Sequence, residues 1–147
     1  MKLVSIYREG EENGLKERYW PNGQLKSEVH MKEDLPDGVL KTYFEEGQIE
    51  TEINYIDGKN HGVTKIYYPD GLLESISEFV HGKLNGEVKH FYSDGTLKVK
   101  RSYVDDVAEG MAIEYHENGQ KKMQVNFENG TIAGAVIEYD TSGVRLN

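Results

Sequence analysis

The feature that most constrains this chain is an internal repeat of 24 residues. When the sequence is written in rows of 24, all 16 glycines fall in three columns, and the one Trp, ten Tyr and four Phe fall in three others. A period of this length predicts a stacked array in which each unit contacts mainly its neighbours. No insertion breaks the register after Tyr7. We therefore expect a single repeat domain over residues 1–147, with an N-terminal cap strand at 1–6 and units starting near 7, 31, 55, 79, 103 and 127.

Each unit carries two turn signals. The first ends in glycine, as in residues 21–23 (Pro-Asn-Gly) and 69–71 (Pro-Asp-Gly). Pro followed by Asn or Asp and then Gly favours a type I turn closed by a glycine with positive φ. The second connection is expected to be longer, as in residues 57–62, where Gly58 and Gly62 lie four apart. Two glycines at that spacing suggest positive φ angles within one tight loop.

Short segments rich in Val, Ile, Thr and Tyr lie between these turns, and such residues favour strands. In residues 48–55, Ile and Thr alternate with Gln and Glu, which predicts one apolar and one polar face. The expected fold is all-β: an elongated single antiparallel sheet of tandem β-hairpins in six repeats. Twelve strands would extend about 55 Å. One face should carry stacked Tyr, Phe and Leu, and the other face charged residues.

The composition restricts the class of partner. The chain has 26 acidic and 17 basic residues, which gives a formal net charge of −9. This balance argues against nucleic acid or an anionic membrane as the main partner, because both require a basic face. The chain has no Cys, which excludes thiolate nucleophiles and cysteine–metal sites. No run of about 18 apolar residues and no signal-peptide core is present, so a cytoplasmic protein is expected.

The repeat unit resembles a known family. Residues 55–62 (Tyr-Ile-Asp-Gly-Lys-Asn-His-Gly) and 67–71 (Tyr-Tyr-Pro-Asp-Gly) are similar to the MORN repeat in its bacterial variant form, and residues 79–95 repeat the pattern. The resemblance implies repeated β-hairpins. It also implies a similarity to bacterial YwqK-type antitoxins, which neutralise a partner toxin. Eukaryotic MORN proteins imply scaffolding or membrane contact instead.

No catalytic motif is recognisable. The sequence contains no His-Glu-x-x-His, no Gly-x-Ser-x-Gly and no phosphate-binding glycine loop. The acidic stretch around Asp105 and Asp106 lacks the alternating oxygen ligands of a calcium loop. We expect no enzyme activity, no cofactor and no metal. The histidines favour turn or surface positions, because a metal cluster needs convergence that the repeat does not suggest: His30, His61, His81, His90 and His116.

One aromatic column is the best candidate for a binding site. A ladder of exposed rings across several hairpins would bind a partner protein, because rigid rings bury much area at low entropic cost. Alternatively, the same ladder is the hydrophobic stack that holds the sheet together. In the last two units His116 and Asp140 interrupt the aromatic column, which favours a localised surface. The candidate partner-binding residues are Trp20, Phe44, Tyr68, Tyr92 and His116.

These observations predict a non-enzymatic protein-binding module. Its most specific form is an antitoxin or immunity protein that blocks a toxin by occlusion. The charge of −9 either keeps the sheet soluble or steers the protein toward a basic partner. The alternatives are a structural scaffold, including a homodimer through sheet edges, and a membrane-associated MORN-repeat protein.

Overall fold

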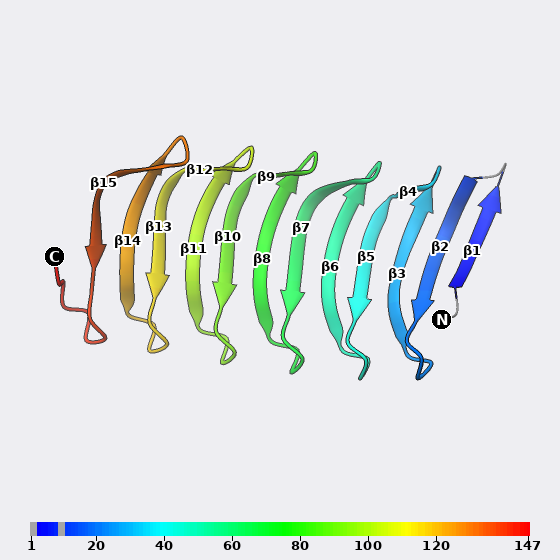
Figure 1. The fold of residues 1–147 in the computed structure, drawn as a ribbon, viewed down its shortest axis with the longest axis horizontal. Helices are drawn as coiled ribbons and strands as arrows, with labels where there is room; N and C mark the ends of the chain where they lie inside the picture. Colours follow the sequence, from blue (N-terminus) through cyan, green and yellow to red (C-terminus); the bar gives the residue numbers. More distant parts are fainter. Residues whose placement is uncertain (1–2, 9–10) are drawn as a thin grey trace.

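The computed structural model describes residues 3–8 and 11–147, with side chains from residue 13 onward. This region contains no helix, and its strands form one antiparallel sheet in which consecutive hairpins lie side by side in a single layer (Figure 1). The predicted fold class is confirmed. The strands are β1 Leu3–Arg8, β2 Glu11–Tyr19, β3 Leu25–Lys32, β4 Leu35–Pro36, β5 Gly38–Tyr43, β6 Ile49–Ile56, β7 Lys59–Tyr67, β8 Leu73–Val80, β9 Lys83–Leu84, β10 Gly86–Phe91, β11 Leu97–Val104, β12 Val107–Ala108, β13 Gly110–Tyr115, β14 Lys121–Glu128 and β15 Thr131–Glu138.

Sequence neighbours are also neighbours in the sheet. The main path runs from β1 to β15, while β4, β9 and β12 pair only with β3, β8 and β11 respectively. Strand β1 pairs with β2 at the position where a cap strand over residues 1–6 is expected, and residues 1–2 lie outside the described residues. Contacts between strands are therefore made by neighbouring strands in the chain, as a solenoid-like array requires.

The first turn signal of each unit forms a five-residue turn, which we call the wide turn. In the first unit the amide of Gly23 donates to the carbonyl of Trp20 at 2.9 Å, and the amide of Trp20 donates to the carbonyl of Gln24 at 2.8 Å. Gly23 has a φ of +88°, so this is the predicted type I turn with a glycine bulge. The wide turns are residues 20–24, 44–48, 68–72, 92–96, 116–120 and 140–144.

The second connection is shorter than the sequence suggested. It is a two-residue turn, which we call the tight turn, and both of its residues have positive φ, as in a type I′ hairpin. The second glycine of each pair instead lies within the next strand: Gly62 has a φ of +91° beside an irregularity in the β6–β7 register. The prediction of one long loop is wrong, because a turn glycine and a bulge glycine look alike in sequence. The tight turns are residues 33–34, 57–58, 81–82, 105–106 and 129–130.

The tight turns also link neighbouring hairpins. The amide of Gly58 donates to the carbonyl of Pro36 at 2.8 Å, and the amide of Gly82 donates to the carbonyl of Asn60 at 2.7 Å. At residue 106 aspartate replaces the glycine, and its main-chain amide still donates a hydrogen bond to the carbonyl of Leu84 at 2.9 Å. Main-chain hydrogen bonds therefore connect the hairpins at the tight-turn end of the sheet.

The two faces differ in burial. Thr42 lies opposite Ser27 and Thr51 on one face, which we call the aromatic face, and Lys41 lies opposite Glu28 and Glu52 on the other, the charged face. All residues less than 10% exposed belong to the aromatic face by this register, and they are few: Val29, Thr64, Ser75, Ala112 and Val125. No second layer covers this face in the described part of the chain, so the core is thin.

The sequence suggested that the aromatic residues lie on one face of the sheet, but the structure places them on both faces. The column containing Tyr43 and Tyr67 lies on the charged face, where their hydroxyls donate to Glu28 at 2.6 Å and to Glu52 at 2.9 Å. A tyrosine suits this position because its ring packs on the sheet while its hydroxyl reaches a carboxylate.

Candidate functional site

The candidate column lies along the wide-turn end of the sheet, and its members bond to the next hairpin. Each of four side chains reaches a main-chain carbonyl 23 residues later in the sequence, and we call these contacts the carbonyl ladder. The ladder bonds run from Trp20 Nε1 to Tyr43 at 3.0 Å, from the Tyr68 hydroxyl to Phe91 at 2.8 Å, from the Tyr92 hydroxyl to Tyr115 at 2.8 Å, and from His116 Nε2 to Tyr139 at 3.0 Å.

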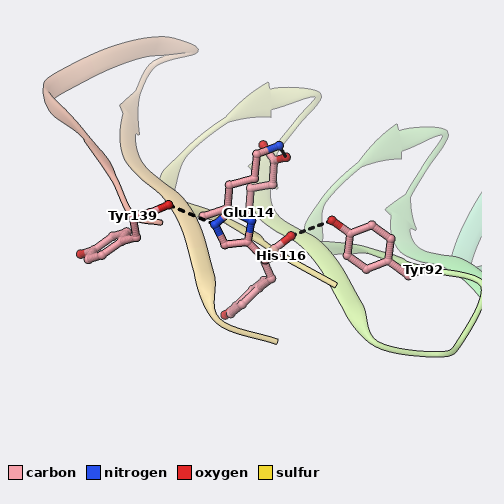
Figure 2. Close-up of polar contacts among 6 residues, drawn as sticks. Tyr92, Glu114, His116 and Tyr139 are labelled. Atoms are coloured by element: carbon pink, nitrogen blue, oxygen red, sulfur yellow. Dashed lines mark hydrogen bonds and ion pairs between the residues drawn. The ribbon is translucent and has the colours of Figure 1, made fainter. Parts of the chain in front are cut away.

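His116 continues this ladder rather than interrupting it. Figure 2 shows the Tyr92 hydroxyl and the His116 ring making equivalent contacts with successive hairpins. The column ends at Asp140, whose carboxylate accepts bonds from its own wide turn, including the Ser142 hydroxyl at 2.6 Å. That hydroxyl, followed by turn amides, lowers the pKa of Asp140. The four residues of the carbonyl ladder therefore share one property, a planar side chain with a hydrogen-bond donor at its tip.

Phe44 is the exception in the column. It has no polar atom and makes no ladder bond to the carbonyl of Tyr67, the equivalent acceptor in the next hairpin. Its wide turn also lacks a side-chain hydrogen bond that other wide turns have. There the Oδ1 atoms of Asn22 and Asp70 accept a hydrogen bond from the main-chain amide two residues later, at 2.9 and 3.0 Å. Glu46 occupies that position, and neither Glu45 nor Glu46 has a side-chain hydrogen bond or ion pair within residues 13–147.

A hollow of about 590 Å³ adjoins Phe44 on the aromatic face. Trp20 and Phe44 supply aromatic surface, and Lys26 Nζ lies 4.2 Å from the centre of the Trp20 ring. Two cations come from β2 and β3, while three carboxylates come from the wide turn and β6. The lining residues are Arg18, Trp20, Lys26, Ser27, Leu40, Thr42, Phe44, Glu45, Glu46 and Glu50.

The structure divides the candidate residues between two hollows. Trp20 and Phe44 meet in the hollow just described, whereas Tyr92 and His116 line one of about 410 Å³ together with Lys122. Glu114 binds Lys122 at 2.6 Å and raises its pKa. Tyr68 lies between the two groups and is placed by its ladder bond. Whether these residues bind a partner stays a prediction.

The charged face carries matched charges. Lys89 and Lys100 bind Glu87 at 2.6 and 3.1 Å, and their hydrogen bonds lower the pKa of that carboxylate. Burial, followed by the hydrogen bond to Glu28, raises the pKa of Tyr43 to about 12.

Two further observations concern chemistry. Within the described residues, no three His, Asp or Glu side chains lie close enough together to hold a metal ion. The nearest approach of two histidines is that of His61 and His81, whose ring centres lie 5.1 Å apart. The described part of the chain also has no helix that could cross a bilayer.

The sequence identified the column but did not predict the hydrogen bonds that its members make to the next hairpin. It also did not predict that Glu45, Glu46 and Glu50 line one hollow with Phe44. One signal was available, since Trp, Tyr and His all carry a donor and only Phe44 does not.

The comparisons with known proteins support the repeat. Five successive segments match the MORN repeat variant family, at residues 12–33, 36–57, 60–81, 84–105 and 108–129. They follow the 24-residue period and together cover well over half of the chain. A comparison with curated proteins finds no match.

Proposed function

This chain belongs to the MORN repeat variant family, and from that premise we propose that it is a non-enzymatic module that binds another protein. One observation carries the proposal: no described residue forms a second layer over the aromatic face, and this face is hollowed beside Phe44. Trp, Tyr and Arg are the residues that contribute most to binding energy at protein interfaces, and Trp20 and Arg18 both line this hollow.

The most specific form of the proposal is an antitoxin or immunity protein that blocks a basic partner by occlusion. The net charge of −9 supports this form, because an acidic surface accelerates association with a basic protein. An elongated sheet about 55 Å long would cover a large part of a small partner.

Cross-linked capture from the native host, followed by growth assays, tests the antitoxin form. We expect capture of a basic protein whose expression alone arrests growth and whose effect is relieved by co-expression of this chain. A captured partner that leaves growth unchanged would remove the toxin from the proposal and retain the binding module. Reproducible capture of nothing would remove the binding module itself.

A structural scaffold is the second candidate, and the strand edges favour it. Within the described residues β1 and β15 each pair with only one strand along the main path, and such edges can pair with another chain. Light scattering over a range of concentrations separates the candidates: a concentration-dependent dimer supports the scaffold, whereas a strict monomer removes it.

A further inference from the structure

The hairpin of β5 and β6 differs from the β2–β3 and β10–β11 hairpins in how its aromatic ring is covered. Lys26 lies over the ring of Trp20, and Lys98 Nζ lies 5.3 Å from the centre of the Tyr92 ring. Each lysine is six residues after its aromatic partner, at the extra residue of a strand bulge. Two units of the repeat therefore contain a built-in cation–π contact.

In the β5–β6 hairpin this position is Glu50 instead of lysine. No cation lies over the Phe44 ring in residues 13–147, and a carboxylate stands where the β2–β3, β10–β11 and β13–β14 hairpins have a lysine. The β7–β8 hairpin also has a glutamate at this position, Glu74, but its aromatic residue Tyr68 keeps its ladder bond. Thr42 Oγ1 donates to Glu50 Oε2 at 3.0 Å, which holds the carboxylate beside the hollow. The ring therefore lacks its cation, and the local charge is reversed.

The same wide turn gives up stabilising contacts that other units keep. Phe44 has no ladder bond, and Glu46 replaces the Asn or Asp that closes other turns. Residues that served only the fold would be expected to keep these bonds, because each contributes to stability. Their loss leaves the Phe44 ring and the Glu46 carboxylate, both of which line the hollow, without a hydrogen-bond or ion-pair partner in residues 13–147.

We propose that the hollow beside Phe44 binds an arginine side chain of the partner protein, an inference that rests on the proposed function as a binding module. The guanidinium stacks on the Phe44 ring, where two other hairpins place their own lysine, and Glu50 and Glu46 accept its hydrogen bonds. Arginine suits this site better than lysine because its planar group stacks and pairs with carboxylates at the same time. A hollow of about 590 Å³ is of the size that holds small groups.

The two cations of the hollow do not replace the missing one. Arg18 and Lys26 come from the first hairpin, and Lys26 is engaged with Trp20. Against them stand three carboxylates, of which Glu45 and Glu46 have no side-chain partner within residues 13–147. The charge beside Phe44 is therefore complementary to a cation from outside.

N-acetyl-arginine-amide is a direct probe of the site, with N-acetyl-citrulline-amide as its uncharged control. Trp20 is the only tryptophan of the chain and lines the hollow, so its indole N–H signal in the nuclear magnetic resonance spectrum reports binding. We expect saturable binding of the arginine probe with a Kd on the order of 1–10 mM. The citrulline probe should bind at least about tenfold more weakly, because it lacks the charge.

Two matched variants test the site. Glu50→Lys supplies the lysine found in other units, and it should reduce binding of the arginine probe about tenfold or more by covering the Phe44 ring. Glu74→Lys makes the same change of charge in the same column, one hairpin further along, and should leave the Kd within about twofold of wild type. Both variants are compatible with the fold, because lysine stands in this column at Lys26, Lys98 and Lys122.

Equal binding of the two probes, equal losses in both variants, or no saturable binding would each overturn the site. The result is separate from the test of the proposed function. Capture of a partner by a protein that ignores the arginine probe would leave the binding module and remove this site. Binding of the probe without any captured partner would leave the site and remove the module.

Discussion

At residue 44 the candidate column has a side chain without a hydrogen-bond donor. This difference separates the residues of the column that hold neighbouring hairpins together from the one that borders the proposed binding site. Trp20, Tyr68, Tyr92 and His116 all bond to a carbonyl of the following hairpin. Their planar side chains are therefore explained by the fold. Phe44 is not explained in this way, and it is the member that borders the hollow.

Restoring the donor at this position should stabilise the protein. Phe44→Tyr places a hydroxyl near the carbonyl of Tyr67, as Tyr68 does for Phe91. We expect the free energy of unfolding in urea to rise by about 0.5–1.5 kcal/mol. Phe91→Tyr is the control. Tyr43 and Tyr67 bond to Glu28 and Glu52, but the residue equivalent to these glutamates for Phe91 is Ile76, which cannot accept a hydrogen bond, so this variant should bring no gain. Equal effects of the two variants would refute the carbonyl ladder.

The raised pKa of Tyr43 predicts that the protein loses stability at high pH. Its pKa is raised to about 12 from an unfolded value near 10, so the folded state favours the protonated hydroxyl. Its contribution is complete below pH 10 and is lost as the pH rises toward 12. Ultraviolet absorbance should show a tyrosine ionising near pH 12 that is absent from Tyr43→Phe, and the variant should lose less stability over this interval. A tyrosine at position 43 that ionised near pH 10 would contradict both its burial and its contact with Glu28.

At the scale of the strands and turns, the sequence predicted as much as local chemistry decides. Pro-Asn-Gly and Pro-Asp-Gly identify the wide turns because these residues favour one backbone conformation. The tight turns were placed but given the wrong length, since Gly58 and Gly62 differ only through the register of β6 and β7. The carbonyl ladder and the hollow depend on where the next hairpin lies, which no local pattern specifies.

Two glycines of the bulge column test the backbone argument. Gly86 has a φ of +123°, and an added Cβ would lie 3.2 Å from the Cβ of Glu78. Gly110 has a φ of +76° and no atom within 4 Å of an added Cβ. Gly86→Ala should destabilise the protein by about 2–3 kcal/mol, and Gly110→Ala by about 1–2 kcal/mol. Chemical denaturation measures both, and a reversed order would contradict the bulge geometry.

At the scale of the whole molecule, residues 3–8 and 11–147 form one sheet without a second layer, and its stability rests on contacts between neighbouring hairpins. Few side chains of the described residues are less than 10% exposed, so the hydrogen bonds between neighbouring hairpins supplement a small hydrophobic core. The same thinness leaves the aromatic face available to a partner. Fold and proposed function therefore follow from one property, a repeat that stacks in one direction only.

Small-angle scattering tests this shape. A compact domain of this length has a radius of gyration of about 15 Å. A twelve-strand sheet about 55 Å long should give a clearly larger value. The value should not change with concentration if the strand edges stay unpaired. A radius near that of a compact domain would contradict the open single-layer sheet.

The central claim is that a partner protein binds at the hollow beside Phe44. Trp20 can be replaced by 5-fluorotryptophan, which gives the protein a single fluorine resonance in that hollow. Addition of the unlabelled captured partner should shift or broaden this resonance in the wild type and in Glu74→Lys, and should leave it unchanged in Glu50→Lys. A resonance that stays unchanged in the wild type while sedimentation shows the complex would place the partner elsewhere and contradict the claim.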